Sequence, residues 1–251
     1  MSALFVGLIV FACAFGGALL GIFLHRKLPV HHREADTKDV VKLVMGLIAT
    51  IAALVLSLLI ATAHSSYGTQ ESEVQALGVH IVQLDAILAN YGPDAADARA
   101  LHRQIVAAQL KRIWPDDGAT NLRAPMSPAA GEDLMDRVAN MPATTDAQRL
   151  AKSRALQLIT QIGETRGLLY EQAGGSLSWP FFVILVFWVV MLFVGFGFLT
   201  RSNATVLVAF FVGALSVAGA IFLILEMNRP YSGLMQISSA PIRSALAAIS
   251  H

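Results

Sequence analysis

The sequence predicts an all-α polytopic membrane protein, in which four transmembrane helices flank a soluble helical domain inserted between the second and third spans. Three observations predict this class. Four long segments are almost free of charged side chains, and 55% of the 251 residues are hydrophobic while only 14% are charged. No useful length of chain alternates polar and apolar residues as a strand does. One soluble core could not bury so much apolar surface, so a membrane must cover the surplus.

The four candidate spans are residues 3–24, 41–63, 179–199 and 205–225. About 20 residues of helix cross a hydrocarbon core of about 30 Å, so each is long enough. Lys42 is the only charged side chain inside them. The first span is followed by His25-Arg26-Lys27 instead of the small-residue cleavage site of a secretory signal, so we expect it to be retained.

Basic residues predict the orientation in a bacterial inner membrane. No basic side chain precedes the first span, whereas five lie in or beside the loop that follows it: Arg26, Lys27, Arg33, Lys38 and Lys42. The positive-inside rule therefore places this loop in the cytoplasm. Both termini and the soluble domain are then expected on the periplasmic side.

We divide the chain into residues 1–63, 64–177, 178–226 and 227–251. These are the first two spans with their basic loop, the soluble helical domain, the last two spans, and a C-terminal turn with a short amphipathic helix. Spacings of three and four predict that the second span continues as one long helix, with an apolar face of Val74, Leu77, Ile81, Leu84 and Leu88. Residues 90–93 indicate a turn into a returning helix that ends near Trp114-Pro115.

The rest of the soluble domain is expected to be a loop over residues 115–128, a short helix over 132–140 and a longer polar helix. Thr145 and Gln148 have the spacing of a capping box that opens this last helix. Its apolar positions are Leu150, Leu158, Ile159, Ile162 and Leu169.

Motifs of catalysis are absent from the sequence, which contains no nucleophile elbow, phosphate-binding glycine loop or zinc-protease helix. The single cysteine, Cys13, excludes an internal disulfide, and the adjacent His31 and His32 near His25 lack the geometry of metal ligands. We therefore expect no enzyme, cofactor or metal. The balanced charge, 18 Lys and Arg against 17 Asp and Glu, gives no indication of nucleic acid.

The second span carries the most informative pattern. Thr50, Ser57 and His64 are seven residues apart and share one helical face with Ala53 and Ala61. Small and hydroxyl side chains around a central axis could line a pore. The expected partners of the protein are then the lipid bilayer, further copies of the chain and small ions. The same residue types also let membrane helices pack closely, and the sequence leaves both interpretations open. Gly17 and Gly21 in the first span are read as a packing face.

The end of the fourth span carries Glu226 and Arg229, an acid and a base three residues apart. They form either a structural ion pair or charges of a pore vestibule. Pro230 and Gly233 then indicate a turn. Ser239 and Pro241 resemble an N-cap and a first-turn proline of a short final helix.

Several segments together resemble the bacterial bestrophin-like family. They are residues 54–63, Ile113-Trp-Pro115, residues 222–231 and residues 238–241; the motif from Glu226 through Pro230, with Gly233 and Pro241, is the most specific. Asn228 and Tyr231 depart from the Asp and Phe usual in the family.

The resemblance implies a pentameric anion channel with four membrane helices per subunit, the second of which lines the pore. Two features differ from bestrophins, which keep the middle segment in the cytoplasm and have an aromatic pore constriction, whereas span two here has no aromatic residue. Two functions are therefore weighed. One is an oligomeric, possibly anion-conducting channel; the other is a non-conducting structural or sensory membrane protein whose helical domain binds a partner.

Overall fold

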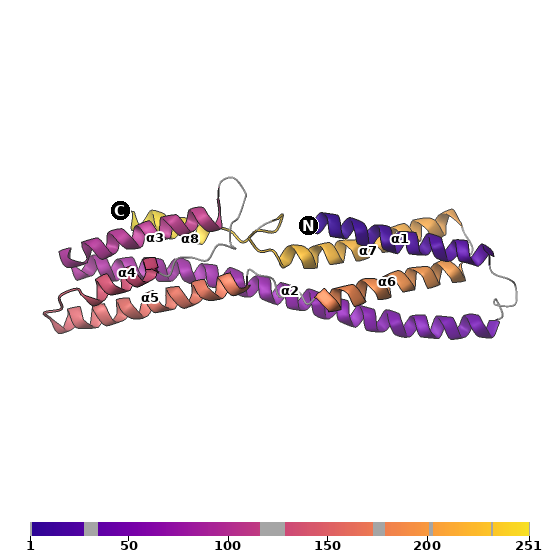
Figure 1. The fold of residues 1–251 in the computed structure, drawn as a ribbon, viewed down its shortest axis with the longest axis horizontal. Helices are drawn as coiled ribbons and strands as arrows, with labels where there is room; N and C mark the ends of the chain where they lie inside the picture. Colours follow the sequence, from indigo (N-terminus) through magenta and orange to yellow (C-terminus); the bar gives the residue numbers. More distant parts are fainter. Residues whose placement is uncertain are drawn as a thin grey trace. The chain divides into compact units, whose positions relative to one another are not determined.

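The computed structural model describes residues 2–27, 35–115, 129–172, 179–200, 203–231 and 233–250, and these contain helices and turns but no strand. The helices are α1 (Ala3–Lys27), α2 (Ala35–Tyr91), α3 (Ala96–Ile113), α4 (Ala129–Ala139), α5 (Asp146–Gln172), α6 (Trp179–Leu199), α7 (Ala204–Met227) and α8 (Ala240–Ile249). The short 3-10 helix η2 (Pro93–Ala95) joins α2 to α3 (Figure 1). The prediction of an all-α fold is confirmed.

Two compact units make up the fold. The membrane unit comprises Met1–Ser66 and Ser176–Asn228, and the extramembrane unit comprises Tyr67–Gly175 and Arg229–His251. Within the described residues, four helices are long and apolar enough to cross a membrane: α1, α6, α7 and the part of α2 that begins at Asp39. The prediction of four membrane spans is therefore confirmed.

Glycines bring α1 and α6 into close contact in the membrane unit. A Cβ added at Gly21 would lie 2.8 Å from the backbone nitrogen of Phe198, and one at Gly197 would lie 3.0 Å from the carbonyl carbon of Ala18. Backbone atoms fill both spaces, so neither position has room for a side chain. Gly17 is also buried against Val190 and Val194 of α6. The prediction that Gly17 and Gly21 form a packing face is confirmed.

The extramembrane unit is built on the second half of α2. The five apolar residues predicted to share one face, Val74, Leu77, Ile81, Leu84 and Leu88, are each no more than 2% exposed. α3 returns after η2, where Gly92 takes a φ of 109° that disfavours other residues. At the end of α2, Tyr91 donates its hydroxyl to the carbonyl of Pro142, in the connection between α4 and α5, at 2.8 Å. The predicted helical hairpin is therefore present.

The capping box at the start of α5 forms as predicted. The Gln148 backbone nitrogen donates to Thr145 Oγ1 at 3.2 Å, and the Thr145 backbone nitrogen donates to Gln148 Oε1 at 3.3 Å. Leu150 was predicted as an apolar contact of this helix, which is wrong because its side chain is 72% exposed. The neighbouring Ala151, one residue further round the helix, packs against the core instead.

The C-terminal turn is closed by a hydrogen bond from the Ile237 backbone nitrogen to the Pro230 carbonyl at 2.7 Å. Gly233 lies in this turn with a φ of 108°, which explains the glycine. Trp114 donates its indole nitrogen to the Ile237 carbonyl at 2.9 Å, and its ring meets Tyr231 edge-on at 5.9 Å between centroids. Two segments that carry the family resemblance therefore contact each other directly.

The start of α8 differs in one detail from the prediction. Ser239 occupies the N-cap position, but its side chain makes no capping hydrogen bond. The hydroxyl of Ser238 instead accepts from the Ala240 backbone nitrogen at 3.1 Å. Pro241 stands in the first turn, and a Cβ added at Gly78 of α2 would lie 3.1 Å from its carbonyl oxygen. Gly78 therefore allows α8 to pack closely on α2.

Acid is expected to destabilise the extramembrane unit through His102. This residue is 2% exposed, its Nε2 lies 3.1 Å from the Ile81 carbonyl oxygen, and burial lowers its pKa below 6.5. Below pH 6.5 the unfolded chain therefore binds a proton that the folded chain does not. Stability is full above pH 6.5 and falls by up to about 1.4 kcal/mol per pH unit below it.

Urea denaturation of the detergent-purified chain at pH 7.5 and pH 5 measures this effect. Trp114 is the only tryptophan of the extramembrane unit, so in a Trp179→Phe, Trp188→Phe background its fluorescence reports unfolding there. His102→Gln should weaken the pH dependence, whereas His64→Gln, at an exposed position, should leave it unchanged. Equal pH dependence in all three chains would show that His102 is not the group responsible.

Candidate functional site

The candidate site is the face of α2 that carries Thr50, Ser57 and His64. All three side chains are exposed, whereas Met45, Ala52 and Ala63 of the same helix are buried in the membrane unit. At about 100° per residue, Ser57 lies about 140° around the helix from Ala52. The predicted stripe is therefore turned away from the packing within its own chain.

α2 is also the span least covered by its own chain. Of its most apolar 18 residues 11% are buried, against 33% for α1. Most of the membrane surface of α2 is therefore left for lipid or for other subunits. A pore formed around this helix requires such a surface, because helices from several copies must meet there.

The exposed face of α2 divides into a small, polar strip and an apolar strip. Gly46, Ala53 and Gly68 extend the strip of Thr50, Ser57 and His64, and a Cβ at Gly46 or Gly68 would have open space around it. Beside them stand Leu54 and Leu58, each 66% exposed. The face thus offers a narrow polar track next to bulky side chains that suit lipid, a neighbouring helix or an apolar constriction.

Hydroxyl groups on this strip remain able to contact a ligand. Thr50 Oγ1 donates to the Gly46 carbonyl at 2.9 Å, as threonines in membrane helices commonly do, and its oxygen lone pairs stay available. Residues 43–63 of α2 contain no ionisable side chain. A ring of carboxylates, the usual selector of cation channels, is therefore missing from this helix face.

The two charges predicted to act together at the end of α7 differ in their exposure to solvent. Glu226 is 4% exposed, at the last turn of α7, while Arg229 is exposed. Asn228, between them, donates its amide to the Ile224 carbonyl at 2.9 Å and so ends the helix. A vestibule role or a structural role for Glu226 and Arg229 stays a prediction.

Metal ligands do not gather in the described part of the chain, where no three His, Cys, Asp or Glu side chains are placed to hold an ion. His31 and His32 lie outside the described residues.

A sequence profile of the bestrophin-like domain matches residues 12–242, nearly the whole chain. The chain belongs to the bestrophin-like family. Its fold agrees: two point variants of a bacterial bestrophin homologue from Klebsiella pneumoniae superimpose with TM-scores of 0.66 and 0.68, at 10% and 11% identity. The alignments cover 97% and 96% of both chains. A variant of a further membrane protein gives a TM-score of 0.69 at 9% identity, over 96% of each chain. No curated protein matches this bestrophin-like chain.

The superpositions show a shared fold at identities of 9–11%. The structure also explains several residues of the family motif. The span of residues 12–242 includes Trp114, Pro230 and Gly233, which the extramembrane unit uses to close the C-terminal turn. The contact of Trp114 with Tyr231 and Ile237 was not predicted from the sequence. A signal for it was present, because Trp114-Pro115 and Pro230-Tyr231 both belong to the segments that resemble the family.

Proposed function

We propose that this bestrophin-like protein is an oligomeric ion channel of the bacterial inner membrane, with α2 of each copy lining a central pore. The observation that carries the proposal is the exposed strip of Thr50, Ser57 and His64 on the side of α2 opposite its packing face. The family resemblance supports a pentamer, because bestrophins assemble in that way with the second span innermost.

We propose that anions are the permeant species. Residues 43–63 of α2 carry no carboxylate to repel an anion, and the Ser57 hydroxyl group can donate a hydrogen bond to a partly dehydrated one. The Thr50 hydroxyl group can do the same only if it releases the Gly46 carbonyl. The bulky Leu54 and Leu58 beside this strip would narrow the path or contact the neighbouring copy. We propose that Glu226 and Arg229 act either as charges of a pore vestibule or as a structural pair that stabilises the end of α7.

The proposed orientation places Arg26 and Lys27 in the cytoplasm and the extramembrane unit in the periplasm, from the positive-inside rule. Labelling a cysteine introduced at the exposed Ser153, in a Cys13→Ser background, with a membrane-impermeant maleimide tests it. Modification in intact spheroplasts supports this orientation, and modification only after lysis reverses it.

Chloride flux into liposomes tests the conduction proposal. The purified chain should carry chloride above the empty-liposome baseline, and Ser57→Leu should return flux to that baseline, because a bulky apolar side chain would block and dewet a narrow path. Ser216→Leu is the matched control, since Ser216 is an exposed hydroxyl on α7 and not on α2.

Both variants must keep the oligomer size of the parent chain in size-exclusion chromatography. Parent-like flux in a correctly assembled Ser57→Leu protein would overturn the assignment of α2. Absence of flux in the parent chain across pH and voltage would favour the second function, a non-conducting membrane protein whose extramembrane unit binds a partner.

A further inference from the structure

The extramembrane unit contains a cavity of about 730 Å³ between α2, α3, α4 and α5. Small-molecule sites in proteins commonly measure about 300–1,000 Å³, so a ligand of ordinary size fits. Most of the lining is apolar and comes from all four helices, with Leu84, Val106, Leu134, Met135, Ile159 and Ile162 as its main side chains. This cavity is separate from the strip on α2 that carries the proposed pore.

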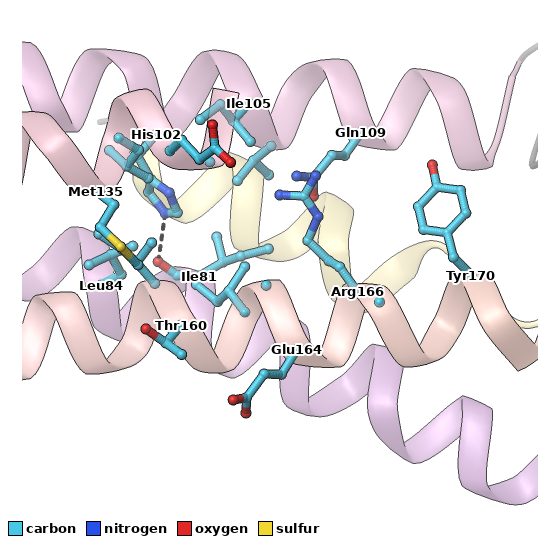
Figure 2. A pocket seen from close by; sticks show the side chains of 18 of the residues that line it. Ile81, Leu84, His102, Ile105, Gln109, Met135, Thr160, Glu164, Arg166 and Tyr170 are labelled. Atoms are coloured by element: carbon cyan, nitrogen blue, oxygen red, sulfur yellow. Dashed lines mark hydrogen bonds between the residues drawn. The ribbon is translucent and has the colours of Figure 1, made fainter. Parts of the chain in front are cut away.

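One wall of the cavity carries a cation. Arg166 points from α5 toward Gln109 on α3 (Figure 2). In the amide orientation that satisfies both groups, the Gln109 side-chain oxygen lies 3.1 Å from Nε, 2.5 Å from Nη1 and 2.9 Å from Nη2 of Arg166. Gln109 is 6% exposed. A guanidinium has five N–H donors, so Arg166 can donate to a ligand carboxylate in addition to its contacts within the protein.

Burial acts against the charge of Arg166. Burial, with a smaller contribution from the nearby positive charge of Arg112, lowers the pKa of this guanidinium to about 10. Arg166 is still a cation at neutral pH. An anion beside it would offset the cost of holding that charge away from water, since charge-assisted hydrogen bonds gain strength where water is scarce.

Tyr170 supplies a second donor one turn along α5 from Arg166. Its buried hydroxyl has no hydrogen-bond partner among the described residues, and it lines the same cavity. The guanidinium of Arg112 lies 5.9 Å from its ring centroid. A buried hydroxyl without a partner destabilises the protein. A ligand oxygen placed here would accept a hydrogen bond from the Tyr170 hydroxyl and remove that cost.

We propose that this cavity binds a small organic monoanion, with its carboxylate on Arg166 and Tyr170 and its apolar body between α2, α3, α4 and α5. The size and apolar lining favour a body of aromatic or short aliphatic groups. Carboxylates at the outer part of the cavity favour a ligand with a single negative charge. Glu132, Glu164 and Glu171 line the outer part and are exposed, and Figure 2 shows Glu164 directed away from Arg166. A polyanion would meet these carboxylates.

Binding of 4-phenylbutyrate to the full chain in lipid nanodiscs tests the proposal, by isothermal titration with empty nanodiscs as the blank. We expect saturable binding of the acid, and binding of the neutral 4-phenylbutyramide weaker by at least about tenfold, since hydrogen bonds to a charged group are stronger than those to a neutral one. Arg166→Gln should weaken binding of the acid by a similar factor and abolish the preference for it over the amide.

Arg154→Gln is the matched control, because Arg154 is an exposed arginine of the same helix outside the cavity, and it should bind as the parent does. Gly163→Phe provides a second variant. Gly163 lines the cavity, and a Cβ at this position meets open space. The added phenyl ring should fill the site and abolish binding of both compounds. Circular dichroism confirms that each variant is folded.

Absence of saturable binding to the parent chain overturns the proposal. Equal affinity for acid and amide, or unchanged affinity in Arg166→Gln and Gly163→Phe, overturns it as well. Because titration requires no ion flux, these outcomes are independent of whether the protein conducts.

Discussion

Replacing Gly21 with leucine is expected to disrupt the membrane unit. The position of a Cβ on Gly21 is already occupied by backbone atoms of Val194 and Phe198 on α6, which cannot rotate aside as a side chain can. Overpacking costs about 1–3 kcal/mol where flexible groups can adjust, and we expect a loss at or above the top of that range here. α1 and α6 should separate, and the pairing of His25 Nδ1 with the Phe198 carbonyl at 2.6 Å should be lost.

The measurement is the yield and monodispersity of the detergent-purified chain, followed by its thermal aggregation temperature. Gly16→Leu is the control, because Gly16 is exposed on the same helix and a Cβ there meets nothing within 4 Å. Gly21→Ala should give a smaller loss in the same direction. Gly21→Leu and Gly16→Leu chains of equal stability would contradict the close contact of α1 with α6.

Helices and their local signals could be predicted from this sequence because each depends on neighbouring residues. The apolar face from Val74 to Leu88 follows from helical spacing, and the capping box of Thr145 and Gln148 from a spacing of three. The spans follow from uninterrupted apolar length. Leu150 shows the limit of this reasoning, since spacing alone did not decide whether it or Ala151 faces the core.

The cavity could not be predicted in the same way, because four helices contribute to it and their contacts are long-range. One signal was present. Ile159, Ile162, Arg166 and Leu169 are spaced by three and four, so Arg166 occupies a position of the buried face of α5. A charged residue at such a position is costly and therefore indicates a partner or a ligand. The exposed strip on α2 was predictable as a helical face, but its orientation away from the bundle required the structure.

Replacing Asp85 with alanine is expected to cause a large loss of stability in the extramembrane unit. Its carboxylate is buried on α2 and accepts from Arg99 Nε at 2.8 Å and Arg99 Nη2 at 2.7 Å, while Arg103 Nε lies 3.8 Å away. Without Asp85, two arginines would face each other's charge at the edge of the core. Removing one partner of a fully buried pair costs about 3–5 kcal/mol. The arginine side chains are 29% and 32% exposed, so solvent screening reduces our expectation to about 2–3 kcal/mol.

Urea denaturation followed by Trp114 fluorescence measures this loss, with Asp133→Ala as the matched control. Asp133 also pairs with an arginine, Arg137 at 3.2 Å, but both side chains are about half exposed, so its loss should have a much smaller effect than the loss of Asp85. The two substitutions therefore remove the same kind of aspartate–arginine pair, once with a buried carboxylate and once with a half-exposed one. A similar small effect for both would mean that the network of Asp85, Arg99 and Arg103 is solvated in the assembled protein. A large effect for Asp85 alone would identify burial as the source of its contribution.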